Sequence, residues 1–186
     1  MPGKSFYRII AEYPKIGVWA ALSATQLFGP YFYSDTINQS KYREILTKFV
    51  NDLENVFGFE ICNSVWFQQD GASSHTAGDT IRYVTSLFGN RTIGKNLAIN
   101  WPPRSPDLST LDFFLWGYVK ELTFQEPPKT IPELKLKITE SFEVVRQNTA
   151  MLRRVQGALV RRCELVVNQQ GKHFEHKVSK KTIFCS

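Results

Sequence analysis

Residues 67–77 read FQQDGASSHTA, and the apolar residues 65–67 lead into them. The run predicts a short strand that stops at Asp70, because the glycine and serines that follow favour a turn. The carboxyl end of a strand is where α/β sheets commonly bind ligands. Aspartate before glycine is also an ordinary turn signal. Asp70 is therefore either a turn residue or a ligand-binding carboxylate.

Strand and helix patterns alternate on both sides of this stretch. Apolar runs predict strands at residues 16–22, 28–33, 65–69 and 97–101. Apolar residues at helical spacing predict helices that begin near Ser40, Ser73 or Ser74, Ser105, Thr130 and Thr149. The order indicates an α/β fold, a sheet with helices packed on it.

Capping residues mark the ends of these elements. Ser40 is the expected N-cap of the first helix and Gly58 follows its end. Gly89 is expected to close the second helix, and Thr130 with Pro132 to open the fourth. Pro30 places the second strand at an edge or a bulge, since proline donates no ladder hydrogen bond.

A second carboxylate interrupts an apolar stripe. Asp112 stands four residues after Leu108 and three before Leu115, on the expected inner face of the helix from Ser105. A lone buried carboxylate costs several kcal/mol unless a partner compensates it. That partner is either a salt bridge or hydrogen bond, or a metal ion. Together with Asp70, Asp112 would grip a divalent cation of the kind that assists phosphodiester cleavage.

Composition and charge restrict the class of protein. The chain of 186 residues is 42% hydrophobic, which suits a folded domain with a core. Three cysteines without metal-type spacing favour a reducing compartment, and no apolar run is long enough to span a membrane. The last 36 residues hold eight basic and two acidic residues and so supply the net charge of +6. This basic end suits either a polyanion or simple solubility.

The paired motifs FQQDGASSHTA and WPPRSPDLSTLDFFLWGYVK resemble the catalytic domain of mariner-like transposases of the Tc/mariner superfamily. The stretches VWAALSATQLFGPYFYSDTIN and GKHFEH add to the likeness, which covers roughly residues 16–176. The resemblance implies a ribonuclease-H-like mixed sheet flanked by helices, with a helical extension from about residue 130 and a basic tail at 177–186. It also implies Mg²⁺ or Mn²⁺ chemistry that cuts transposon ends and joins them to target DNA, in the nucleus, by a homodimer.

The resemblance transfers roles to particular residues. Asp70 matches the second catalytic carboxylate and metal ligand of the family, and Asp112 matches the third. Asp107 fits a first-turn helix residue that favours the helix dipole. His75 matches a histidine that supports the metal ligand or contacts the DNA backbone; alternatively, it is only a partly exposed residue at a helix start. The predicted nucleic-acid-binding residues on the last helix are Arg153, Arg154, Arg161 and Arg162.

Several features depart from the family. Its first catalytic aspartate has no counterpart in the segment FYRII, where Glu12 is the nearest carboxylate, and Asp35 falls where the family has no ligand. We therefore expect this chain to lack the family's first strand, with its aspartate, and the family's helix-turn-helix region. Ser73-Ser74 and Thr110 stand where prolines are common. The alternative prediction is a catalytically inactive nucleic-acid-binding remnant; an unrelated α/β interaction module is a third.

Overall fold

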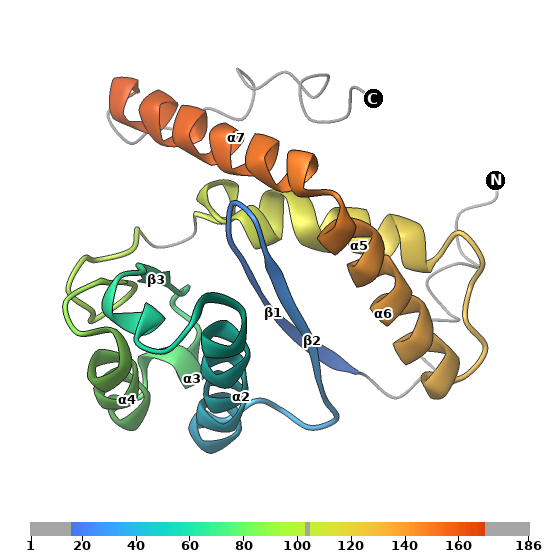
Figure 1. The fold of residues 1–186 in the computed structure, drawn as a ribbon, viewed down its shortest axis with the longest axis horizontal. Helices are drawn as coiled ribbons and strands as arrows, with labels where there is room; N and C mark the ends of the chain where they lie inside the picture. The colour runs from blue at the N-terminus through green and yellow to red at the C-terminus, as the bar shows by residue number, and fades with distance from the viewer. Residues whose placement is uncertain (1–15, 103–104, 170–186) are drawn as a thin grey trace, which may run out of the picture. The chain divides into compact units, whose positions relative to one another are not determined.

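The computed structural model describes residues 16–102 and 105–169, which divide into two compact units (Figure 1). Unit 1 comprises the chain up to Ser34 and from Pro106 onward; unit 2 is Asp35–Ser105. The segment FYRII, Glu12, the GKHFEH stretch and the basic tail lie outside the described residues.

Unit 1 is built on a β-hairpin. Strands β1 (Gly17–Leu22) and β2 (Leu27–Tyr33) pair antiparallel, with an irregular register between Trp19 and Ala21. Gly29 and Pro30 together face the single residue Ala20, so of the edge or bulge expected from the proline the structure shows a bulge. Arg146 donates hydrogen bonds to the carbonyls of Leu27 and Gly29, which fixes the bulge to helix α6 (Ile131–Gln147).

Helices cover this hairpin and complete a single core (Figure 1). The chain re-enters unit 1 through the 3₁₀ turn η2 (Pro106–Leu108) and the π-helical turn η3 (Leu111–Leu115). Helices α5 (Trp116–Thr123), α6 and α7 (Thr149–Asn168) follow. The buried residues of the hairpin and helices form one cluster: Ala20, Leu27, Phe114, Leu115, Val119, Ile138, Phe142, Val145, Leu152 and Val155. The C-terminal helices thus share the core that supports η3.

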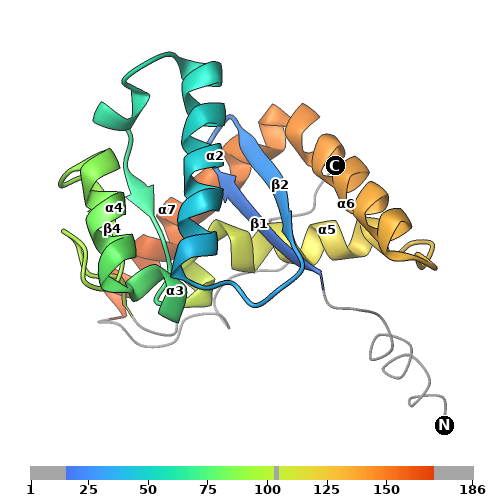
Figure 2. The same cartoon turned by 90° about the horizontal axis from the view of Figure 1, so that it is seen from below.

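Unit 2 contains a short parallel strand pair and several helices (Figure 2). Its elements are α2 (Gln39–Phe57), η1 (Ile61–Asn63), β3 (Phe67–Gln68), α3 (Ser73–Thr76), α4 (Gly78–Phe88) and β4 (Thr92–Ile93). The ring of Phe67 stacks on Phe88 of α4, with centroids 4.8 Å apart, and tilts against Phe49 of α2 at 6.1 Å. These contacts anchor β3, and therefore the turn that follows it, between two helices.

Helix caps agree with the sequence in most places and shift in one. Gly58, Gly89 and Thr130 cap their helices as predicted, and the Thr130 side chain accepts from the Glu133 N–H. Helix α2 begins earlier than expected because Asn38, not Ser40, is its N-cap and accepts from Lys41. Asparagine is at least as good a cap as serine, so the earlier residue takes the role.

Three elements are more irregular than the sequence pattern predicts. The helix expected from Ser73 or Ser74 is broken at Ala77, whose ψ of 141° is extended, into α3 and α4. The expected strand at residues 97–101 is reduced to one parallel bridge between Ile93 and Ile99. The helix expected from Ser105 begins only at Trp116, after η2 and η3. Each candidate carboxylate therefore lies in a stretch of short, irregular elements within its own unit.

Candidate metal and nucleic-acid site

Asp70 stands two residues after the end of β3 and turns its side chain largely to solvent, with 60% of that side chain exposed. Its Oδ1 accepts the N–H of Ala72 at 3.0 Å, which closes a tight Asx turn. Two alternative roles were predicted for Asp70, a turn residue or a ligand-binding carboxylate. The two roles are compatible, because the turn uses only Oδ1. Among the described residues no hydrogen bond or ion pair reaches Oδ2.

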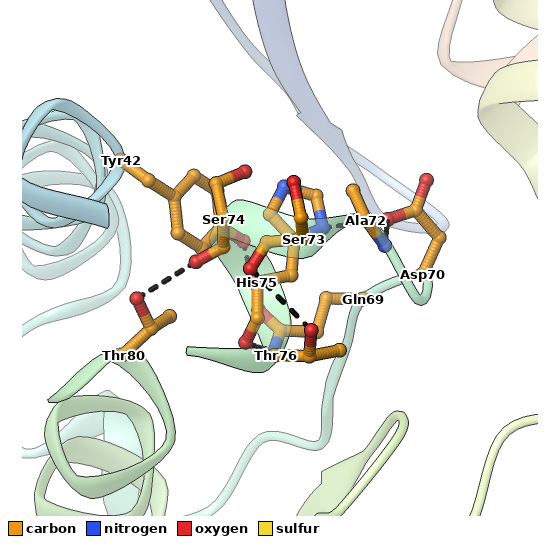
Figure 3. A network of polar contacts seen from close by, with 9 residues as sticks. All are labelled: Tyr42, Gln69, Asp70, Ala72, Ser73, Ser74, His75, Thr76 and Thr80. Atoms are coloured by element: carbon orange, nitrogen blue, oxygen red, sulfur yellow. Dashed lines mark hydrogen bonds and ion pairs between the residues drawn. The ribbon is translucent and has the colours of Figure 1, made fainter. Parts of the chain in front are cut away.

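His75 lies against the same oxygen (Figure 3). Its Nδ1 is 2.6 Å from Asp70 Oδ1, and only 15% of the imidazole side chain is exposed. Nδ1 lies within hydrogen-bonding distance of Oδ1, although the N–H direction is not well aligned with that oxygen. Hydrogen bonding by the His75 side chain is the main reason that the pKa of the Asp70 carboxyl lies below its ordinary value; partial burial opposes this, and the Ala72 N–H and then the charge of His75 lower the pKa further.

A buried polar network fixes the position of His75 (Figure 3). Its ring stacks on Tyr42 of α2 with centroids 4.1 Å apart. The Tyr42 hydroxyl donates to Gln69 Oε1 at 2.8 Å, and Gln69 Nε2 donates to the His75 carbonyl at 3.1 Å. Tyr42 is 1% exposed and Gln69 6%, so both bonds are shielded from water. Asp70 therefore sits on a rigid support that joins α2, β3 and α3.

The loop after β4 presses against this network from the other side. The Gln69 N–H donates to the Ile93 carbonyl at 2.9 Å, which continues the parallel ladder. A Cβ placed on Gly94 would lie 3.1 Å from Gln69 Cγ and 2.8 Å from Leu97 Cδ1. Only glycine allows so close an approach without a shift of these neighbours. The network is thus enclosed by the backbone at Gly94 and needs a residue without a side chain there.

Asp112 lies in the π-helical turn η3 and is exposed. The prediction that it is buried inside an apolar stripe is wrong. A π turn has more residues per turn than an α-helix, and a 3₁₀ turn has fewer, so the spacing from Leu108 to Leu115 does not follow 3.6 residues. Phe114 and Leu115 take the inner face instead. Asp112 is consequently accessible, and π turns are frequent at functional sites.

Each of the two candidate carboxylates, taken by itself, has the chemistry of a hard-cation ligand. Each offers exposed oxygen atoms of the kind that Mg²⁺ and Mn²⁺ prefer. Within the described part of the chain, the contact of Asp70 with His75 is the one ion pair that either carboxylate makes. Asp70 belongs to unit 2 and Asp112 to unit 1. Within residues 16–102 and 105–169 no three His, Cys, Asp or Glu side chains form a metal-binding group. A shared ion between Asp70 and Asp112 stays a prediction.

The four arginines of α7 fall into two kinds. Arg153, Arg154 and Arg161 are exposed, as phosphate-binding residues must be. Arg162 is 7% exposed; its Nη1 donates to the Asp107 carbonyl at 3.2 Å, and its guanidinium lies 4.3 Å from the centre of the Phe113 ring. This burial corrects the prediction that Arg162 contacts nucleic acid, because its guanidinium is turned toward the protein.

Tyr42 and Gln69 were not predicted from the sequence as parts of the site. Tyr42 reads as one more apolar position of an amphipathic helix, and Gln69 as a polar residue at a strand end. A glutamine directly before a candidate ligand is the only local signal, and it does not indicate burial. The pairing depends on how α2 packs on β3, which residue spacing does not encode.

The chain is similar to known transposases in sequence and in fold. No family model matches the chain. The chain is 23% identical over 158 residues to the transposable element Tc3 transposase of Caenorhabditis elegans, covering 83% of this chain. It spans 44% of that curated relative, less than half of its length.

Solved structures of Mos1 transposase share the fold. The catalytic domain in complex with raltegravir and Mg matches with a TM-score of 0.69 and 22% identity, over 86% of this chain and 76% of that one. A pre-cleavage Mos1 transpososome matches with a TM-score of 0.70 and 20% identity, over 86% and 45% of the two chains. The chain therefore shares the fold of the Mos1 catalytic domain, which confirms the predicted ribonuclease-H-like fold class.

The match to Tc3 transposase adds a homologue to this likeness of fold. Together the two comparisons confirm the resemblance to the catalytic domain of mariner-like transposases. None of the helices in the described ranges is both long and apolar enough to cross a membrane.

Proposed function

We propose that this chain is a transposase-derived DNA-processing domain, in which Asp70 and Asp112 hold a divalent cation for phosphodiester cleavage and strand transfer. The observation that carries the proposal is the support of Asp70: one carboxylate oxygen is fixed by the Ala72 N–H and His75, and the other faces outward. A turn aspartate needs only the first of these contacts. The fold shared with Mos1 transposase, whose structures include a pre-cleavage transpososome, supports the proposal.

Bound Mg²⁺ or Mn²⁺ would activate the attacking oxygen and stabilise the leaving oxygen at a phosphodiester. The residues of this chain have separate tasks. Asp70 Oδ2 and the exposed Asp112 carboxylate offer hard oxygen ligands. His75 holds Asp70 in place, and the Tyr42–Gln69 bond holds His75. Mos1 structures with Mg and with Mn support both cations as candidates.

DNA is the proposed partner, bound through Arg153, Arg154 and Arg161. These three side chains place positive charge along one exposed helix, and phosphate contacts of this kind give affinity without sequence preference. The Mos1 transpososome and the Mos1 paired-end complex support this partner. A homodimer and a nuclear location belong to the same proposal, because a transposase acts on paired ends of chromosomal DNA.

Nicking of supercoiled plasmid by the purified chain with Mn²⁺ tests the proposal. The variants Asp70→Asn and Asp112→Asn preserve side-chain shape and remove the charge, and each is expected to abolish nicking. Asp107→Asn is the matched control, because the structure uses only the backbone carbonyl of Asp107. Nicking that survives both Asp70→Asn and Asp112→Asn would refute the proposal.

One observation favours a second candidate, a DNA-binding domain without cleavage. By the resemblance, the first catalytic aspartate lies on the strand before the one that matches β1, and the segment FYRII at that place carries no acidic residue. Two carboxylates alone leave most of the cation's oxygen ligands to water and phosphate. Salt-sensitive DNA binding without Mn²⁺-dependent nicking would identify this second candidate.

A further inference from the structure

Arg162 is a cation that the proposed DNA contact does not use. Its side chain lies on the inner side of α7, and the residue is only 7% exposed. Burial of a charge is unfavourable unless hydrogen bonds or other charges compensate it. Two neighbours do so: the Asp107 carbonyl, 3.2 Å from Nη1, and the face of the Phe113 ring, 4.3 Å from the guanidinium carbon. Cation–π contacts are strongest where water is excluded.

These two neighbours lie on either side of Asp112. Asp107 belongs to η2 and Phe113 to η3, and the Asp112 N–H donates to the Ser109 carbonyl between them at 3.0 Å. The guanidinium therefore spans the segment that presents the Asp112 carboxylate. Asp112 itself is exposed, so its own side chain does little to hold that segment.

The segment needs an external support because of its local geometry. It runs from a 3₁₀ turn into a π turn, and both are less favourable than an α-helix of equal length. On the inner side Phe114 and Leu115 anchor it to the core. On the side of α7, Arg162 supplies a directional bond to a carbonyl and a flat surface against a ring, a combination that lysine cannot reproduce.

We propose that Arg162 is a positioning residue that fixes the Asp107–Phe113 segment and thereby places the Asp112 carboxylate. The link to catalysis rests on the proposed function, whereas the effect on the segment does not. Arg161, its neighbour in sequence, has the opposite role, because it is exposed and free to meet phosphate. The adjacent pair gives a matched control within one helix turn.

Amide hydrogen exchange of the full chain tests the placement directly. Arg162→Met is expected to speed exchange at residues 108–113 by about tenfold, the effect of losing one buried cation–π contact and one hydrogen bond. Arg161→Met is expected to leave exchange there unchanged. Arg162→Lys retains the charge and a donor without the planar stack, so it should give an intermediate rate. Phe113→Leu removes the ring and should resemble Arg162→Met, which provides a second route if Arg162→Met does not fold.

Exchange at residues 108–113 that is unchanged in both Arg162→Met and Phe113→Leu would overturn the inference. This outcome is independent of whether the chain cleaves DNA, so it is distinct from a failure of the proposed function. The Mn²⁺ concentration for half-maximal nicking gives the second readout. It should rise several-fold in Arg162→Met and fall back toward the original value in Arg162→Lys.

DNA affinity separates the two arginines. Arg161→Met should weaken binding and reduce the salt dependence by about one unit of slope, as expected for one lost phosphate contact. Arg162→Met should leave the slope unchanged. A reduced salt dependence of DNA binding in Arg162→Met, with normal exchange at residues 108–113, would indicate that Arg162 contacts DNA and would contradict the inference.

Discussion

The hydrogen bond between Tyr42 and Gln69 is the feature whose removal has the most defined consequence. In Tyr42→Phe the ring remains and keeps its stack on His75, whereas the donor to Gln69 Oε1 is lost. Both residues are at least 94% buried, since Tyr42 is 1% and Gln69 6% exposed, so water cannot easily replace the donor. A buried acceptor left without a partner costs about 1–3 kcal/mol. We expect Tyr42→Phe to lower the free energy of unfolding by that amount.

Tyr83→Phe is the matched control. The Tyr83 hydroxyl lies 2.7 Å from Thr47 Oγ1 and joins α4 to α2 within unit 2, but this pair is solvent-exposed. Its loss should change stability by less than about 0.5 kcal/mol. Urea denaturation followed by circular dichroism measures both variants.

A double-mutant cycle completes the test. Gln69→Met removes the acceptor, so the Tyr42→Phe and Gln69→Met effects should be coupled by about 0.5–1.5 kcal/mol. Equal effects of Tyr42→Phe and Tyr83→Phe, together with zero coupling, would refute the reasoning that a buried network supports Asp70.

Three further predictions concern the same site. The Asp70 pKa is lowered in the folded chain, so the stability that Asp70 contributes is complete above its unfolded pKa and is lost as the pH falls through its folded pKa. His75→Ala should therefore raise the Asp70 pKa in an NMR titration of the carboxyl carbon, and an unchanged pKa would contradict this prediction. Gly94→Ala should cost about 1–3 kcal/mol because its Cβ would meet Gln69 and Leu97, whereas Gly117→Ala, with nothing within 4 Å, should be neutral or stabilising in thermal denaturation. Neutralising Arg153 and Arg154 together should reduce the salt slope of DNA binding by about two units, and a smaller effect than that of Asp79→Asn would exclude them from the interface.

The sequence predicted the regular parts of the fold well, for physical reasons. Helix α7 was expected to begin near Thr149 and is found at Thr149–Asn168, because a long amphipathic pattern identifies a helix by itself. The bulge at Pro30 followed from the missing N–H of proline. The position of Asp70 at a strand end was likewise readable from an apolar run and a glycine.

The irregular parts were not predictable from spacing. Asp112 was expected inside and is exposed, because a π turn changes the residue phase that a 3.6-residue count assumes. Arg162 was grouped with its exposed neighbours, although only the packing of α7 on η2 shows that it faces inward. The Tyr42–Gln69 bond joins residues 27 positions apart and depends on the docking of a helix on a strand.

The central claim is that Asp70 and Asp112 hold one cation between them. Calorimetric titration of Mn²⁺ into the chain, Asp70→Asn, Asp112→Asn and the double variant tests it most directly. A shared ion predicts that each single variant loses the same binding event and that the double variant loses no more. Two separate events, each removed by only one substitution, or binding that survives the double variant, would contradict the account.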